Sequence, residues 1–113
     1  ILSVAAAVAS GKTVFRGAQE LRNKESDRLR AVSEQFGKAG VKIKELEDGL
    51  EINGMHDLQV KGCTVDSMND HRIAMSLGIL SLLTKQKVTI LNTGCIDTSF
   101  PGFKDMFKTM WNN

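Results

Sequence analysis

One order of elements occurs twice in this chain, and this repeat limits the folds that the sequence can adopt. An apolar segment at Ile1–Ala9 is followed by an alternating, β-branched stretch at Lys12–Arg16, a loop and a helical stretch. The same order recurs between residues 70 and 111, about 75 residues further on, as expected of two copies of one structural unit. Alternation of helices and strands is typical of α/β proteins. The sequence therefore predicts an α/β fold with a repeated unit whose second copy is incomplete.

Hydrophobic spacing and turn residues predict where the individual elements lie. The second helix has apolar residues three or four positions apart, at Leu29, Val32 and Phe36, which form one helical face. Glu47-Asp48-Gly49 between two short apolar stretches indicates a hairpin. We expect helices at residues 1–9, 24–39, 70–84 and 102–111, and strands at 12–16, 41–46, 50–52, 58–65 and 88–91.

Length and composition favour one globular domain over residues 1–113. The 113 residues are 42% hydrophobic, which suffices for one core, and a net charge of +2 without basic runs indicates neither a nucleic-acid nor a membrane partner. No apolar run approaches the roughly 18 residues of a membrane-spanning helix. Cys63 and Cys95 lack the spacing of a zinc site, so we expect free thiols in a reducing cytoplasm and no metal. The chain starts without Met on an apolar helix, which predicts a fragment of a longer protein.

The segment Arg22–Leu29 contains the strongest local motif. Asn23 is expected to cap the second helix, which places Lys24 and Arg28 in its first turn. A helix N-terminus is already partly positive, so each basic residue there costs roughly a few tenths of a kcal/mol. A bound anion would reverse the sign of this effect, because backbone N–H groups and both side chains would converge on it. The motif thus predicts an anion site.

Glu25 has two possible roles in this segment. On a helix that begins at residue 24, it falls on the same side as the apolar face around Leu29 and Val32. A sheltered carboxylate with basic neighbours is a candidate proton carrier, because shelter tunes its pKa. The alternative is an ordinary helix start with a Glu25–Arg28 ion pair. The residues alone leave both readings open.

A second helix start repeats this arrangement. Asn69 or Asp70 is expected to cap the helix at 70–84, and His71 and Arg72 then occupy its positive end. A lone His is more often structural than catalytic, but two helix starts with the same charge pattern indicate a double anion site. In the third segment, Cys95–Phe103, Pro101 suits the first turn of the last helix.

Three segments, RNKESDRL at 22–29, NDHRIAMS at 69–76 and CIDTSFPGF at 95–103, resemble the C-terminal signatures of the 5-enolpyruvylshikimate-3-phosphate synthase family. They occur in the family's order, and the resemblance covers essentially the whole chain. It implies a fold of two similar domains, each built from three βαβαββ-type units, with the site in the cleft between them. This chain would hold about one and a half units of the C-terminal domain, and the N-terminal domain would be absent.

The resemblance also implies an activity and a set of residues. The family transfers the enolpyruvyl group of phosphoenolpyruvate to shikimate 3-phosphate, releases phosphate, and needs no metal and no organic cofactor. By position, Arg28 and Arg72 would bind phosphoenolpyruvate, with His71 beside Arg72. Lys24 would contact shikimate 3-phosphate and help to move protons, and Glu25 would be the acid–base residue. The full-length protein is expected to be a cytoplasmic monomer.

Departures from the family pattern and rival functions limit this interpretation. Thr98 stands where many relatives carry a Lys that also contacts phosphoenolpyruvate, and Glu20 stands where some carry Asn. The family's catalytic Asp is expected just before Ile1, so the fragment alone is predicted to be inactive and to bind phosphoenolpyruvate weakly. The alternatives are a non-catalytic anion-binding module and the related enolpyruvyl transferase that acts on a nucleotide sugar.

Overall fold

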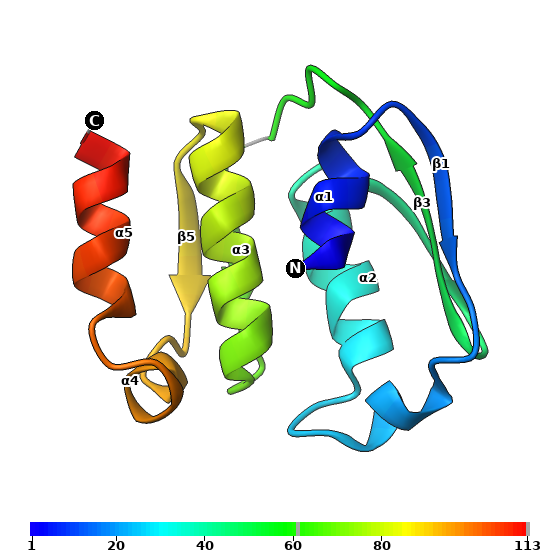
Figure 1. Ribbon diagram of the computed structural model, residues 1–113, viewed down its shortest axis with the longest axis horizontal. Helices are drawn as coiled ribbons and strands as arrows, with labels where there is room; N and C mark the ends of the chain where they lie inside the picture. Colours follow the sequence, from blue (N-terminus) through cyan, green and yellow to red (C-terminus); the bar gives the residue numbers. More distant parts are fainter. Residues whose placement is uncertain (61, 113) are drawn as a thin grey trace.

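Helices and strands alternate along the chain in a mixed fold (Figure 1). The computed structural model describes residues 1–60 and 62–112. In chain order the elements are α1 (Leu2–Val8), β1 (Gly11–Phe15), the 3₁₀ helix η1 (Gln19–Asn23), α2 (Arg28–Lys38), β2 (Lys42–Leu46), β3 (Gly49–Gly54), β4 (Cys63–Asp66), α3 (His71–Thr84), β5 (Val88–Leu91), α4 (Cys95–Ser99) and α5 (Phe103–Asn112).

The strands form two small sheets. The first has the order β1-β3-β2, and both of its pairings are antiparallel, with the register Gly11 opposite Gly54 and Phe15 opposite Leu50. The predicted hairpin is confirmed, since β2 and β3 pair directly on either side of the turn at residues 47–48. The second sheet pairs β4 with β5 in parallel, and α3 forms the crossover between them.

The helices pack against the sheets and against one another. α1 contacts β3, α2 contacts β2, and both contact α3. α5 lies at the opposite side of α3 from α1 and α2 (Figure 1). The largest fully buried side chains are Phe36, Leu29, Ile52, Leu77 and Leu80, which come from α2, β3 and α3. One hydrophobic core therefore joins the first sheet to the helix between β4 and β5.

The predicted repeat is visible in the order of the elements. The series α1–β1–η1–α2 recurs as α3–β5–α4–α5, with a short helix inserted after the strand in each copy. In both copies the strand runs toward the end of the molecule at which the next long helix begins (Figure 1). The prediction of a mixed α/β fold is confirmed.

Four details differ from the sequence-based expectation. α2 begins at Arg28 and not at Lys24, because Asp27 caps it by accepting a hydrogen bond from the Arg30 N–H at 3.1 Å. The strand expected at 58–65 begins only at Cys63. The Leu58 N–H instead donates a hydrogen bond to the Met55 carbonyl, which forms a turn, and position 61 lies outside the described residues. The short helix α4 was not expected, and Pro101 precedes α5 instead of lying in its first turn.

Candidate active site

The starts of α2 and α3 lie at the same end of the molecule, which is the lower end in Figure 1. β1 and β5 point toward this end, and α4 lies there as well. The two helices are in contact. Arg28 is the first residue of α2, and Arg72 is the second residue of α3. The two helix starts that the sequence singles out are therefore neighbours in space.

A hollow of about 560 Å³ opens between α1, β1, α2 and α3. Arg28 and Arg72 both line it. Arg16, which directly follows β1, is a third arginine in its wall. The remaining wall is largely apolar and includes Leu29 and Ile73, which are almost fully buried. Positive side chains set against apolar walls interact more strongly with an anion than they would in open water. We call this cavity the arginine-lined hollow.

Asp70 connects the two helix starts. Its side chain is fully buried, and its Oδ2 accepts hydrogen bonds from Arg28 Nε and Ser26 Oγ, each at 2.8 Å. Its Oδ1 accepts from the backbone N–H of Arg72 at 3.0 Å and so caps α3. Burial alone would raise the pKa of Asp70, but the hydrogen bonds from Arg28 and Ser26 and the Arg28 charge outweigh it and hold this pKa below its usual value.

Glu25 lies outside the helix on which its sheltered position was predicted. It sits in a bend before α2, and 53% of its side chain is exposed, so the predicted place on the apolar face is wrong. Its Oε2 accepts a hydrogen bond from Arg28 Nη2 in an ion pair. The alternative reading, a Glu25–Arg28 ion pair, is therefore present, but it forms next to the arginine-lined hollow.

Lys24 and His71 are less closely engaged. Lys24 is exposed in the same bend as Glu25, because Asn23 ends η1 and does not cap α2. His71 is half-buried at the first position of α3, beside the exposed Arg72. Neither Lys24 nor His71 is among the residues that line the arginine-lined hollow. The structure thus brings Arg28 and Arg72 together in the lining. Glu25 is outside the lining as well, but its ion pair with Arg28 connects it to the hollow.

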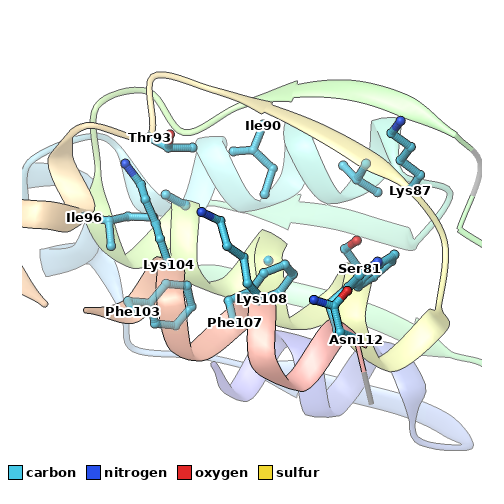
Figure 2. A pocket seen from close by; sticks show the side chains of 14 residues that line it. Ser81, Lys87, Ile90, Thr93, Ile96, Phe103, Lys104, Phe107, Lys108 and Asn112 are labelled. Atoms are coloured by element: carbon cyan, nitrogen blue, oxygen red, sulfur yellow. The ribbon is translucent and has the colours of Figure 1, made fainter. Parts of the chain in front are cut away.

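A second hollow of the same size lies between α5, α3 and β5 (Figure 2). Phe103 and Phe107 of α5 face Ile90 of β5 across it, and its lining also includes Lys87, Lys104 and Lys108. Its lining includes none of the predicted site residues. The arginine-lined hollow is therefore the candidate site, and the second hollow is lined in part by aromatic side chains of α5.

The described residues offer no group of three or more His, Cys, Asp or Glu side chains that could hold a metal ion. Within residues 1–60 and 62–112, no helix is both long and apolar enough to cross a membrane.

Comparison with known proteins assigns the chain to a family. The family model for EPSP synthase (3-phosphoshikimate 1-carboxyvinyltransferase) matches residues 1–107. The chain belongs to the EPSP synthase family. It is 48% identical over 108 residues to 3-phosphoshikimate 1-carboxyvinyltransferase of Geotalea daltonii, covering 96% of the chain and 25% of that protein. It is 49% identical over 105 residues to the protein of the same name from Pelotomaculum thermopropionicum, covering 93% of the chain and 24% of that protein.

Solved structures agree with this assignment. An EPSP synthase from Acinetobacter baumannii superposes with a TM-score of 0.89 at 38% identity, covering 96% of the chain and 26% of the solved one. A second structure of EPSP synthase from the same organism gives a TM-score of 0.85 at 34% identity. The chain spans about a quarter of the length of the EPSP synthase relatives that it matches.

Three polar residues of this EPSP synthase segment were not picked out by sequence reasoning. Asp70 accepts a hydrogen bond from Arg28, and Ser26 donates one to Asp70. The sequence indicated Asp70 only as a helix cap. Arg22 donates hydrogen bonds to the carbonyls of Leu46 and Glu47, at 2.7 Å and 3.0 Å, and so fixes the bend before α2 against the hairpin. The acidic residues of the hairpin turn are a weak sequence signal for the contact of Arg22. No local signal predicts the contacts of Asp70 with Ser26 and with Arg28.

Proposed function

We propose that this chain is part of an enzyme that transfers the enolpyruvyl group of phosphoenolpyruvate to shikimate 3-phosphate and releases inorganic phosphate. One observation carries the proposal: Arg28 and Arg72, from two different helix starts, line a single hollow in a chain of the EPSP synthase family. Phosphoenolpyruvate is a small molecule with a carboxylate and a phosphate, and two guanidinium groups suit two such anions. Relatives that are 46–50% identical bear the name 3-phosphoshikimate 1-carboxyvinyltransferase.

Different basic residues would bind the two substrates. In the described part of the chain, the Nη1 group of Arg28 has no hydrogen-bond partner, although Nε and Nη2 are engaged. Nη1 is therefore available for an anion in the arginine-lined hollow, together with the exposed guanidinium of Arg72. Lys24 would contact shikimate 3-phosphate from its exposed bend, and His71 would support Arg72. A basic cluster of this kind also stabilises phosphate as it leaves.

Glu25 would act as the acid and base of the reaction. In its protonated form it gives a proton to the methylene carbon of phosphoenolpyruvate, and the neighbouring carbon becomes electrophilic. A hydroxyl oxygen of shikimate 3-phosphate then bonds to that carbon, and its proton passes by way of Lys24 to the phosphate group that leaves in the next step. From the resulting tetrahedral intermediate phosphate departs, and the methyl group returns a proton to Glu25 as the double bond re-forms. The ion pair with Arg28 supports this role because it holds the Glu25 carboxylate beside the anion site.

The remaining parts of the proposal concern the whole protein. Residues 1–113 would form a single domain, the C-terminal part of the fold. The other ligands of shikimate 3-phosphate would come from the rest of the protein, because the chain spans about a quarter of its relatives. The reaction would use neither a metal nor an organic cofactor. We propose a cytoplasmic monomer with no nucleic-acid or membrane partner.

A non-catalytic anion-binding module is the second candidate. The observation in its favour is the exposure of Glu25, since a carboxylate that is 53% exposed and paired with Arg28 can serve the ion pair alone. The related transferase that acts on a nucleotide sugar finds no support in the names of the relatives.

Exchange of Glu25→Gln in the full-length protein separates the first two candidates. Gln keeps an acceptor for Arg28 Nη2 but cannot carry the proton, so we expect phosphate release to fall by about 100-fold or more. The affinity for phosphoenolpyruvate, measured by calorimetry, should stay within about threefold, since both arginines remain. Glu20→Gln is the matched control, because Glu20 is an exposed carboxylate in η1 and should leave both quantities unchanged. Turnover that survives in the Glu25 variant would refute the acid–base role, and a wild type that binds phosphoenolpyruvate without turnover would favour the anion-binding module.

A further inference from the structure

Asp70 makes more contacts than the cap of α3 requires. A cap needs one side-chain oxygen that accepts from a backbone N–H of the first turn, and Oδ1 does this for Arg72. The other oxygen, Oδ2, is turned away from its own helix toward the start of α2, where it accepts from Arg28 Nε and Ser26 Oγ. A single carboxylate therefore holds two elements that are far apart in the sequence.

The contact with Arg28 fixes the direction of its guanidinium. Nε donates to Oδ2 at 2.8 Å, and Nη2 approaches Oδ1 at 3.4 Å, so Asp70 takes one edge of the planar group. A guanidinium held along one edge cannot rotate, so its remaining donors point in one direction. Glu25 takes a further hydrogen of Nη2, which leaves Nη1 as the donor group for a ligand. Arg28 is itself almost fully buried, which restricts it further.

The contact with Arg72 fixes the place from which its side chain starts. Arg72 is the second residue of α3, and its backbone N–H is bound by the same carboxylate that holds Arg28. The first turn of α3 therefore cannot shift relative to the first turn of α2 without breaking a hydrogen bond of Asp70. Because both arginines line the arginine-lined hollow, the separation of these two helix starts sets the spacing of the two positive groups.

We propose that Asp70 is a positioning residue that sets the separation and the direction of Arg28 and Arg72 for one doubly anionic ligand. This inference rests on the proposed function, which supplies phosphoenolpyruvate as that ligand. Burial of a carboxylate is costly, and Ser or Asn would cap a helix equally well, so capping alone does not explain an aspartate here. The partnership with buried Arg28 explains both the charge and the burial.

Asp70→Asn in the full-length protein tests the proposal. Asn keeps the cap and the shape but loses the charge that holds Arg28, so the KM for phosphoenolpyruvate should rise about tenfold or more. The KM for shikimate 3-phosphate should stay within about twofold. Asp27→Asn is the matched control, since Asp27 also caps a helix and pairs with an arginine, Arg22, but does not contact Arg28 or Arg72 through its side chain. Its variant should leave both KM values unchanged even if its melting temperature falls.

A second variant covers the case in which Asp70→Asn does not fold. Ser26→Ala removes only the hydrogen bond from Ser26 Oγ to Asp70 Oδ2, so it should raise the KM for phosphoenolpyruvate about two- to fourfold with an unchanged melting temperature. Equal KM values for phosphoenolpyruvate in wild type and in either folded Asp70 or Ser26 variants would overturn the proposal. So would a rise of both KM values together, since that is the result of a purely structural role. Absence of turnover in the wild type would instead refute the proposed function, and calorimetry with phosphoenolpyruvate would still report on Asp70.

Discussion

Gly54, the last residue of β3, lies where the end of α1 meets the first sheet. A methyl group on its Cα would stand 2.2 Å from the carbonyl oxygen of Ala6 and 2.1 Å from that of Ala9. Real Cβ atoms stay at least 3.0 Å from their neighbours. Both oxygens belong to the backbone of α1 and its C-terminal end, so they cannot rotate away as a flexible side chain could. Gly54→Ala therefore forces α1 and β3 apart.

The size of the effect follows from this geometry. Overpacking a core costs about 1–3 kcal/mol, and two backbone contacts place Gly54→Ala at the upper end, about 3 kcal/mol. Total stabilities of domains are about 5–15 kcal/mol, so this is a large share. For a chain near 100 residues, 1 kcal/mol corresponds to about 4–8 °C in melting temperature, so we expect a fall of roughly 12 °C or more. A displaced α1 should also weaken anion binding, because its first residues line the arginine-lined hollow.

Thermal unfolding followed by circular dichroism measures this fall, with Gly94→Ala as the matched control. Gly94 has φ −58° and ψ −29°, which alanine adopts readily, and a Cβ there would meet nothing within 4 Å. Its variant should be neutral or more stable by about 0.4–1 kcal/mol, because alanine restricts the unfolded chain. If Gly54→Ala melts within about 3 °C of the wild type, or no lower than Gly94→Ala, then α1 does not approach β3 closely enough to exclude a side chain at Gly54.

Two further predictions concern acid stability and the end of α3. The pKa of Asp70 is lower in the folded chain than in the unfolded one, so its ionised form contributes stability above about pH 4 that is lost as the pH falls toward the folded value. In urea unfolding, the stability difference between wild type and Asp70→Asn should therefore be largest near neutral pH and shrink by pH 3; a difference independent of pH would contradict the assignment. Lys85 ends α3 at φ 53°, a left-handed conformation that suits glycine, so Lys85→Gly should raise the melting temperature by a few degrees. Lys87→Gly, two residues away, should lower it slightly, and equal effects of the two exchanges would show that the left-handed turn is not the cause.

The elements that the sequence predicted correctly are those with local signals. The helix at 71–84 has a capping aspartate and an apolar interior in its sequence, and its predicted bounds agree with the structure to within one residue. The hairpin was recognisable from Glu47-Asp48-Gly49 for the same reason. The repeated order of helix, strand, loop and helix was also visible in the sequence, although the short helices η1 and α4 stand where loops were expected.

The misplaced start of α2 shows where local signals fail. Asn23 and Asp27 are both favoured caps, and the sequence does not say which one is used. The choice is made by contacts from distant residues: Arg22 is tied to the carbonyls of the hairpin, and Ser26 is drawn toward Asp70. The exposure of Glu25 follows from that choice. Charge pattern and family resemblance pointed to Arg28 and Arg72, but only the fold brings them to one hollow.

The contact between Arg28 and Asp70 also joins the two copies of the repeated unit. The first copy provides Arg28, and the second provides Asp70 and Arg72, so neither copy alone contains both arginines of the arginine-lined hollow. A ligand that bridges the two arginines binds only the docked arrangement and must favour it by mass action. At 100 times its dissociation constant such a ligand adds about 2.7 kcal/mol to the docking of the copies. Binding of such a ligand and docking of the two copies are therefore thermodynamically coupled. A substrate that binds both arginines would stabilise the contact between the two copies of the repeated unit.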